Sequence, residues 1–211
     1  MEWSEKLKRQ IPQGWKVENL KKNQLCKIMK SGINYFEGEK KYFTTSDVIE
    51  NDINFNPNKI RYENRESRAN MQPIKKSIWF AKMKNSKKIL FFFDFSKEHI
   101  EDIILSTGFA GLECFDDSEF YIWNFINDKY FEIAKDRLSS GATQEAINND
   151  YLSLINILIP PKNIIKQFKD ETESIYKKIY DIKLSNEKLL NLKNFISPIL
   201  LNDRLDIIKV L

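Results

Sequence analysis

The sequence predicts an α+β protein in which a globular domain of mixed strands precedes a long C-terminal coiled-coil helix. Through about residue 118 most segments are rich in β-branched and aromatic residues, which favours strands. After Pro160 and Pro161, apolar residues recur at helical spacing. With 211 residues, 42% of them hydrophobic, the chain can bury one sizeable core. We therefore expect a domain over residues 1–159, followed by an arm and a tail over residues 160–211.

Within the domain, glycines and prolines separate four segments with strand composition. These segments are residues 24–36, 40–49, 77–84 and 87–95.

Helical spacing appears next, over residues 118–138, with Ser118 as a candidate N-cap. The buried stripe of this helix would consist of Phe120, Trp123, Ile126 and Phe131. The isoleucine-rich residues 155–159 predict a last strand, which the two prolines end.

The arm should be a helix that the prolines open and that ends near Ser197, before Pro198. It would be ~50 Å long, more than one small domain needs to cover its core. Steps of three and four residues from Ile165 give a seam in which seven of ten positions are apolar. We therefore expect dimerisation through a coiled coil, with Asn186 marking its register, although the helix packing back on its own domain is an alternative. The contacts would be Ile165, Phe168, Ile175, Ile179, Ile182, Asn186, Leu189 and Ile196.

Charge is distributed unevenly along the domain. Residues 59–88 contain ten basic and two acidic side chains, a net charge of +8. Residues 94–119 contain eight acidic side chains and one lysine, a net charge of −7. A domain polarised in this way attracts polyanions to one face, which makes the basic segment a candidate nucleic-acid-binding surface.

Within the basic segment, residues 64–76 have the side chains that read base edges. Arg65 and Arg68 have the fork that pairs with guanine, and Asn70 and Gln72 have the amide that pairs with adenine. Lysines suit phosphates, which fix position without specifying sequence; here they are Lys75, Lys76, Lys82, Lys84, Lys87 and Lys88. Thr143 and Gln144 are further candidates to face the groove.

Several classes of protein are disfavoured by composition. No apolar run approaches the ~18 residues of a membrane span, and the N-terminus lacks the apolar core of a signal peptide. We therefore expect a cytoplasmic protein without a membrane partner. One histidine and two cysteines without CxxC spacing argue against a zinc site, and neither a metal nor a cofactor is predicted.

Four stretches resemble the specificity subunits of type I restriction-modification enzymes. They are "IPQGWKVENLKK" (11–22), "STGFAGLEC" (106–114), "GATQEAINNDYLSLINILIPP" (141–161) and "LLNLKNFISPILLN" (189–202). The third is the most specific of the four. One departure is Ile165, which stands where family members usually carry a glutamine.

This resemblance implies a non-catalytic subunit that recognises double-stranded DNA. Full-length members have two target recognition domains and two spacer helices, whereas this chain has one of each. The resemblance therefore implies a homodimer, or pairing with a second specificity chain, that reads a bipartite site. Its further partners would be the methyltransferase (modification) subunit and the translocase (restriction) subunit.

Two other functions remain open at this point. One is a metal-dependent nuclease that uses the acidic cluster of Asp94, Glu98, Glu101 and Asp102. The other is a coiled-coil scaffold protein that binds no DNA. Magnesium-dependent cleavage would favour the first, and the absence of DNA binding at low salt would favour the second.

Overall fold

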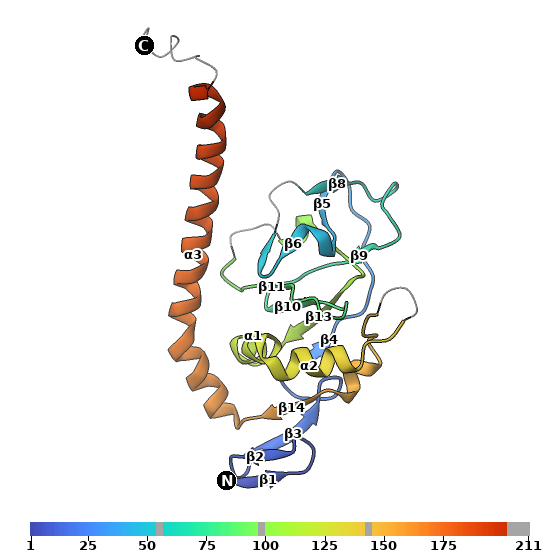
Figure 1. Ribbon diagram of the computed structural model, residues 1–211, viewed down its shortest axis with the longest axis vertical. Helices are drawn as coiled ribbons and strands as arrows, with labels where there is room; N and C mark the ends of the chain where they lie inside the picture. Colours follow the sequence, from blue (N-terminus) through green and yellow to red (C-terminus); the bar gives the residue numbers. More distant parts are fainter. Residues whose placement is uncertain (54–56, 97–99, 142–144, 202–211) are drawn as a thin grey trace. The chain divides into compact units, whose positions relative to one another are not determined.

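The computed structural model describes residues 1–53, 57–96, 100–141 and 145–201 (Figure 1). It has the expected α+β fold with a long C-terminal helix. The chain divides into two compact units, Met1–Lys169 and Asp170–Leu211. The first two turns of the long helix thus belong to the first unit, and the division into functional domains after residue 159 stays a prediction.

The elements are short in the first unit and long only in the C-terminal helix. The strands are β1 (Glu2–Ser4), β2 (Arg9–Ile11), β3 (Lys16–Asn19), β4 (Cys26–Ile28), β5 (Lys40–Phe43), β6 (Val48–Ile49), β7 (Asp52–Ile53), β8 (Asn58–Ile60), β9 (Ala69–Met71), β10 (Ser77–Ala81), β11 (Ile89–Phe92), β12 (Ile103–Ser106), β13 (Phe109–Cys114) and β14 (Asn156–Ile159). The helices are α1 (Glu119–Asn127), α2 (Lys129–Arg137) and α3 (Lys162–Leu201), with 3₁₀ turns η1 (Thr45–Asp47), η2 (Ile100–Asp102) and η3 (Tyr151–Leu154).

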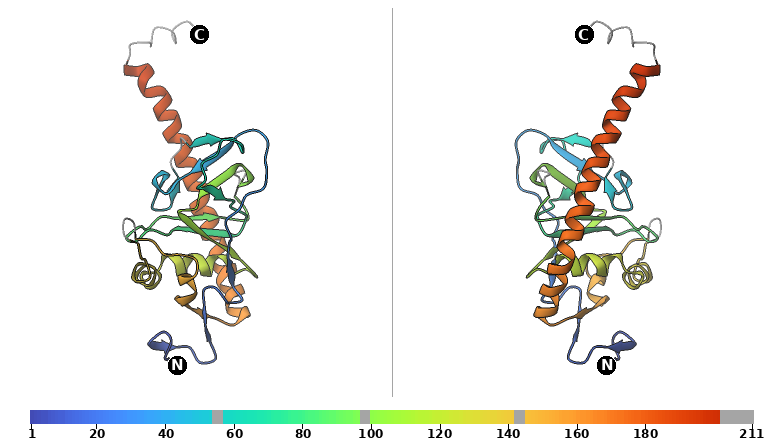
Figure 2. Two further views of the ribbon diagram at one scale, coloured as in Figure 1. Left: turned by 90° about the vertical axis from the view of Figure 1, so that its right-hand side faces the viewer. Right: turned by 90° about the vertical axis from the view of Figure 1, so that its left-hand side faces the viewer.

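Two four-stranded sheets form the centre of the first unit. One has the order β11-β10-β13-β4 and is antiparallel throughout. The other has the order β8-β5-β12-β9, in which β5 and β12 run parallel and the remaining pairs antiparallel. In Figures 1 and 2, helices α1 and α2 cover one face of the first sheet, and the second sheet covers its other face. The unit therefore has three layers.

Strand β10 is buried along its whole length because both of its faces are covered. Ile78 and Phe80 pack into the core cluster that contains residues of α1 and α2. Trp79 and Ala81 alternate with them and pack into the cluster shared with the second sheet. A Cβ on Gly111, directly opposite Trp79 in β13, would lie 2.6 Å from the Trp79 ring. Glycine is thus required where the indole ring crosses the neighbouring strand.

The single helix expected over residues 118–138 is two helices, so that prediction was wrong. Asp128 has an extended backbone (ψ 145°) between α1 and α2, and its side chain accepts a hydrogen bond of 2.7 Å from Tyr130 N. Helical periodicity does not reveal this break, because Asp128 acts as an N-cap inside an otherwise continuous pattern. Ser118 makes no side-chain cap bond, since its hydroxyl donates to Leu25 O instead. The expected stripe is confirmed, with Phe120, Ile126 and Phe131 buried and Trp123 packed beside them.

Helix α3 also differs from the expectation at both ends. Pro161 takes the N-cap position, with its carbonyl accepting from Ile164 N and Ile165 N, so the helix begins at Lys162. At the other end the helix continues through Pro198 to Leu201. Proline removes one hydrogen bond to the carbonyl four residues earlier, and here that carbonyl lies in an exposed stretch that water can reach. The 40 residues make a helix about 60 Å long.

An ion-pair network ties the start of α3 to the loop that precedes α1. Lys169 Nζ lies 2.6 Å from Asp117 Oδ1 and 3.0 Å from Glu119 Oε1. Lys162 Nζ lies 3.0 Å from Asp116 Oδ2. Glu119 is 3% exposed, and its Oε2 has no hydrogen-bond partner among the described residues. Lys169 is therefore the main compensation for a buried carboxylate.

The network shifts the pKa values of its members in the directions that this geometry requires. Burial alone would lower the pKa of Lys169, but its hydrogen bonds to Asp117 and Glu119 raise that pKa above the usual value. The hydrogen bond from Lys169 lowers the pKa of Asp117 below its usual value. Both shifts mean that the charged forms are favoured by folding.

The close contact between Gly111 and Trp79 predicts that Gly111→Ala destabilises the protein. The added methyl group would meet a fully buried, rigid ring, and such overpacking costs about 1–3 kcal/mol. Thermal melting would measure the loss. The double variant with Trp79→Phe removes the ring atoms nearest the new methyl group, so it should lose less stability than the sum of its two single variants. Strict additivity would contradict the assigned contact.

The ion-pair network predicts that Lys169→Met lowers the free energy of unfolding by about 3 kcal/mol at neutral pH, because Glu119 is left buried with only the more distant Lys76, at 4.0 Å, as a counter-ion. The raised pKa of Lys169 means that its contribution is fully present below its unfolded value of about 10.4. The lowered pKa of Asp117 means that its contribution is present above about 3.9 and is lost as pH falls through the folded value. Urea titrations should therefore show the difference from wild type shrinking below about pH 4. A difference that grew on acidification would rule out this assignment.

Candidate nucleic-acid interface

The basic segment 59–88 passes through the centre of the fold, so its cations emerge at separate places. Lys59 and Arg61 leave β8 and lie 3.6 and 3.7 Å from carboxylate oxygens of Glu39. Lys76 precedes β10 and Lys82 follows it, which separates them by a buried strand about 17 Å long. The single basic surface expected from the sequence is therefore divided.

The end of β10 at Lys82 lies at the corner where the two four-stranded sheets are joined. Thr107 and Gly108 connect β12 of one sheet to β13 of the other. Lys82 N donates to Gly108 O at 2.9 Å, and Thr107 N donates to Arg68 O at 2.8 Å. A Cβ on Gly108 would lie 3.2 Å from Arg68 Nη2, so the guanidinium group lies directly against this glycine. The corner thus brings Arg68 and Lys82 together from segments on different sheets.

These two cations have no compensating carboxylate in the part of the chain that the structure describes. Among the described residues, neither Arg68 nor Lys82 has an acidic oxygen within 4.0 Å of its side-chain nitrogens. Burial, and secondly the Arg68 guanidinium, lower the pKa of Lys82. An anion such as a phosphate would relieve the repulsion between the two charges. We refer to Arg68, Gly108 and Lys82 as the basic corner.

The loop between β10 and β11, residues 82–88, is bound along one side by residues 145–147. Lys84 N donates to Glu145 O, and Ile147 N donates to Lys82 O, both at 2.9 Å. Ser140 and Ala146 exchange two backbone hydrogen bonds of 3.1 and 3.2 Å. These two residues, one before and one after the Gly-Ala-Thr-Gln stretch, therefore lie side by side. The predicted contact residues Thr143 and Gln144 lie outside the described residues, but the segment that follows them contacts the basic loop.

The four predicted base readers divide into two pairs. Arg65 stacks 3.8 Å from the centre of the Tyr62 ring and donates to Tyr62 O at 2.6 Å. Gln72 donates to the carbonyls of Pro73, Ile100 and Ile103 at 2.9–3.2 Å. These two side chains therefore support the local structure.

By contrast, the side chains of Arg68 and Asn70 make no hydrogen bond to any described residue. Arg68 is exposed and directly precedes β9, and Asn70 is half-buried within β9. Of the four predicted readers, they are the pair whose polar groups are available to a ligand.

The predicted phosphate-binding lysines also differ in their surroundings. Lys75 and Lys87 are exposed. Lys84 Nζ pairs with Glu145 Oε2 at 2.7 Å, and Lys88 Nζ donates to Thr45 O at 2.6 Å. Lys76 belongs to the other end of β10, with Nζ 4.0 Å from Asp117 and Glu119. Only part of the predicted set therefore lies near the basic corner.

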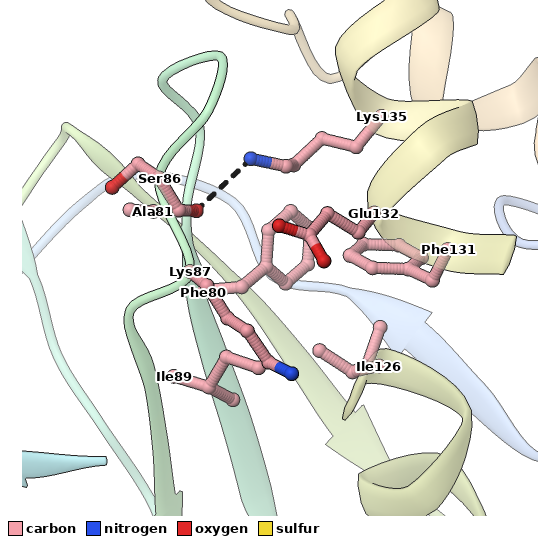
Figure 3. A pocket seen from close by; sticks show the side chains of 9 residues that line it. All are labelled: Phe80, Ala81, Ser86, Lys87, Ile89, Ile126, Phe131, Glu132 and Lys135. Carbon is pink, nitrogen blue, oxygen red and sulfur yellow. Dashed lines mark hydrogen bonds between the residues drawn. The ribbon is translucent and has the colours of Figure 1, made fainter. Parts of the chain in front are cut away.

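Sequence reasoning missed Lys135, which holds the basic loop from the side of α2. Its side chain is buried, and its Nζ donates to Met83 O at 2.7 Å and to Ser86 O at 3.0 Å. A signal was present, because Lys135 follows the buried Phe131 by four residues and so shares its face of the helix. The small cavity beside it has a volume of about 10 Å³, room for about one water molecule (Figure 3).

The acidic cluster of the nuclease alternative is only partly described. Asp94 follows β11, Glu101 and Asp102 lie in η2, and Glu98 lies outside the described residues. Across the residues with described positions, no group of three or more His, Cys, Asp and Glu side chains is placed to hold a metal ion. In that same part of the chain, no helix combines the length and apolar character needed to cross a membrane.

The predicted seam of α3 divides between the two units. Ile165 is 3% exposed in the core of the first unit, and Phe168 packs against Tyr121 with ring centres 6.4 Å apart. These two residues therefore serve the domain itself, in place of the dimer contact assigned to them. In the second unit, the large apolar residues of the predicted seam are exposed by 39–62%; they are Ile175, Ile179, Ile182, Leu189 and Ile196. Asn186 is exposed among them.

Comparison with solved structures identifies chains with the same fold. One belongs to a structure of the type I R-M system that addresses complex assembly and conformational transition; its TM-score is 0.62 at 14% identity, over 89% of this chain and 48% of that chain. The HsdS subunit from Thermoanaerobacter tengcongensis gives 0.60 at 14% identity, with the same coverage. The type I restriction-modification S subunit from M. genitalium gives 0.53 at 12% identity, over 91% of this chain and 47% of that chain.

No family model and no curated protein matches the sequence. At identities of 12–14% the structural likeness shows the fold, and this chain spans about half the length of each of the three solved chains. The chain therefore shares its fold with roughly half of a type I specificity subunit.

Proposed function

We propose that this protein recognises double-stranded DNA as the specificity component of a type I restriction-modification enzyme. The observation that carries the proposal is the basic corner, where the exposed Arg68 and the half-buried Lys82 have no carboxylate partner among the described residues, in a fold like that of HsdS subunits. Its role is recognition without catalysis, and the methyltransferase and translocase subunits of the assembly perform the chemistry. A cytoplasmic location accords with this role.

We further propose that one chain reads half of a bipartite site. The structural relatives are about twice as long as this chain, which has one globular unit and one long helix. The exposed seam in residues 170–201 supports pairing with a second copy, or with a second specificity chain, through α3. Such pairing supplies the second recognition domain.

Within the recognition domain, we assign base reading to Arg68 and Asn70, and phosphate contact to Lys82 with its neighbours in the basic loop. The planar guanidinium of Arg68 matches guanine O6 and N7, and the amide of Asn70 matches adenine N6 and N7. Lys82 is a point charge that suits a phosphate of either strand. Thr143 and Gln144 are the next candidates for base contacts.

The assignment of readers is tested by separating specific from general binding. Cognate duplexes would first be selected from a randomised library with the wild-type protein. Arg68→Lys and Asn70→Ala should then each weaken binding to the selected duplex by about 1–3 kcal/mol and leave binding to random duplex nearly unchanged. Arg68→Lys retains the charge and loses only the planar fork. Fluorescence anisotropy would give both affinities.

Lys82→Ala is the matched comparison, since it removes a charge from the same corner. It should weaken selected and random duplexes about equally and reduce the slope of log affinity against log salt by roughly 0.9. If both Arg68→Lys and Asn70→Ala still distinguish the selected duplex from random duplex as well as the wild type does, the Gly-Ala-Thr-Gln stretch becomes the next candidate for base reading. If the wild-type protein binds no duplex at low salt, the scaffold function replaces the proposal.

Pairing through α3 predicts that Ile182→Asp dissociates the protein into monomers. Residue 182 is a seam position, and a carboxylate there would be desolvated in the paired helices. Light scattering at micromolar concentration should give the mass of two chains for the wild type and of one chain for the variant.

Asn191→Asp introduces the same charge on the opposite face of the helix, so it should leave the mass unchanged. A wild-type protein that is monomeric at these concentrations, with the second specificity chain absent, would contradict homodimerisation.

A further inference from the structure

Lys135 is a buried cation that lies against the basic loop of residues 82–88. It belongs to α2, and 3% of its surface is exposed. An ammonium group taken out of water is costly unless its hydrogen-bond donors all find acceptors. The acceptors of Lys135 therefore show what the residue is placed to hold.

All of its acceptors are in the loop or next to it. Nζ donates to Met83 O at 2.7 Å and to Ser86 O at 3.0 Å, and lies 3.2 Å from Asp136 Oδ1. Figure 3 shows the side chain extending from α2 to the loop, with the bond to Ser86 drawn. The two carbonyl hydrogen bonds and the ion pair together compensate the buried ammonium group. The loop is thus drawn onto α2 by its own carbonyl groups.

Asp136 extends the same contact to the tip of the loop. Its Oδ1 accepts from Asn85 N at 3.1 Å, and Asn85 has a left-handed backbone (φ 56°). Asparagine tolerates this conformation better than most residues, but it still needs surrounding contacts to hold it. Lys135 and Asp136 together fix the loop from residue 83 to residue 86.

The fixed loop also determines the position of Lys82 at the basic corner. Lys82 immediately precedes the fixed part of the loop, and its backbone is bonded to Gly108 and Ile147. These bonds hold Lys82 beside Arg68, although the two charges repel each other. If the loop were released, Lys82 would move away from Arg68 into water, where each charge is better solvated.

We propose that Lys135 is a positioning residue for DNA binding, which holds the basic loop on α2 so that Lys82 stays beside Arg68 and the other lysines of the loop keep their places for the DNA backbone. The inference rests on the proposed function. Lys135 itself is enclosed and does not touch DNA. Its contribution is preorganisation, because a loop already held in its bound conformation loses less entropy on binding.

The test is Lys135→Met in the full-length protein, with a short random-sequence duplex as the probe. Affinity would be measured over a series of salt concentrations, well below the melting temperature of the variant. We expect roughly 10-fold weaker binding at low salt and a salt slope reduced by about 1–2, the equivalent of one or two lost phosphate contacts. A lysine that contributed only to stability would lower the melting temperature without changing this slope.

Lys169→Met is the matched control, because it removes the same charge from a largely buried position at the other end of β10. It should lower the melting temperature and leave the salt slope at the wild-type value. Asp136→Ala is a milder variant that keeps both carbonyl contacts of Lys135, and we expect an intermediate reduction in slope. If Lys135→Met does not fold, the salt slope of Asp136→Ala tests the proposal in its place.

Wild-type slopes in both Lys135→Met and Asp136→Ala would overturn the inference and leave the proposed function intact. Equal reductions in Lys135→Met and Lys169→Met would also overturn it, since the effect would then be one of charge or stability. Failure of the wild-type protein to bind duplex DNA at any salt concentration would instead refute the proposed function, and the inference with it.

Discussion

The burial of β10 on both faces is the constraint on which the rest of the domain depends. Its side chains alternate between the helical layer and the second sheet, and the Trp79 ring fits only because Gly111 lacks a side chain. A strand covered in this way has a fixed position and direction. The charged groups that leave its two ends therefore have fixed positions as well, and each end has acquired a different role. At one end Lys76, Asp117 and Glu119 meet the first turns of α3, and at the other Lys82 meets Arg68.

The two ends handle charge in opposite ways. Near α3, the buried carboxylate of Glu119 and the half-buried one of Asp117 are neutralised by lysines, and the pKa shifts of Asp117 and Lys169 both favour the ionised pair. At the basic corner, two positive charges are held together with no acidic partner among the described residues, so a repulsion remains that an anion would relieve. Neutralised charge is suited to joining parts of the protein, and unneutralised charge to attracting a ligand. The same strand thus separates lysines that are neutralised within the domain from a lysine that is not neutralised by any described residue.

Much of the fold could be predicted from sequence because it depends on local composition. Strands such as β10 and β11, the buried stripe of residues 120–131 and the existence of α3 all follow from apolar spacing. The break at Asp128 could not be predicted, since the capping bond that causes it leaves the periodicity intact. Pro198 was expected to end the helix, but α3 continues for three residues beyond it in an exposed stretch where water can replace the lost hydrogen bond.

The candidate site was less predictable, because its composition depends on contacts between distant segments. Arg65 and Gln72 have the chemistry of base readers, but a stacked tyrosine and three carbonyl groups occupy them. Counting charge along residues 59–88 gave one basic surface, whereas a buried strand divides that surface. Lys135 escaped notice because a lysine is normally counted as a surface residue. Only the fold shows which polar groups are already engaged.

The hydrogen bonds around the basic loop also restrict how recognition can be inherited. Residues 82–88 contact α2 at Lys135 and residues 145–147 through the backbone, so three stretches of chain must match one another. A crossover between two related genes that fell between these stretches would join a loop to a foreign helix, with a buried ammonium group facing the wrong carbonyls. Chimaeras that exchange the whole interval from residue 68 to the end of β14 keep every one of these contacts, together with the proposed readers Arg68 and Asn70, within a single parent. Under the proposed function, specificity should therefore pass between such proteins as an intact block, and seldom as single loops.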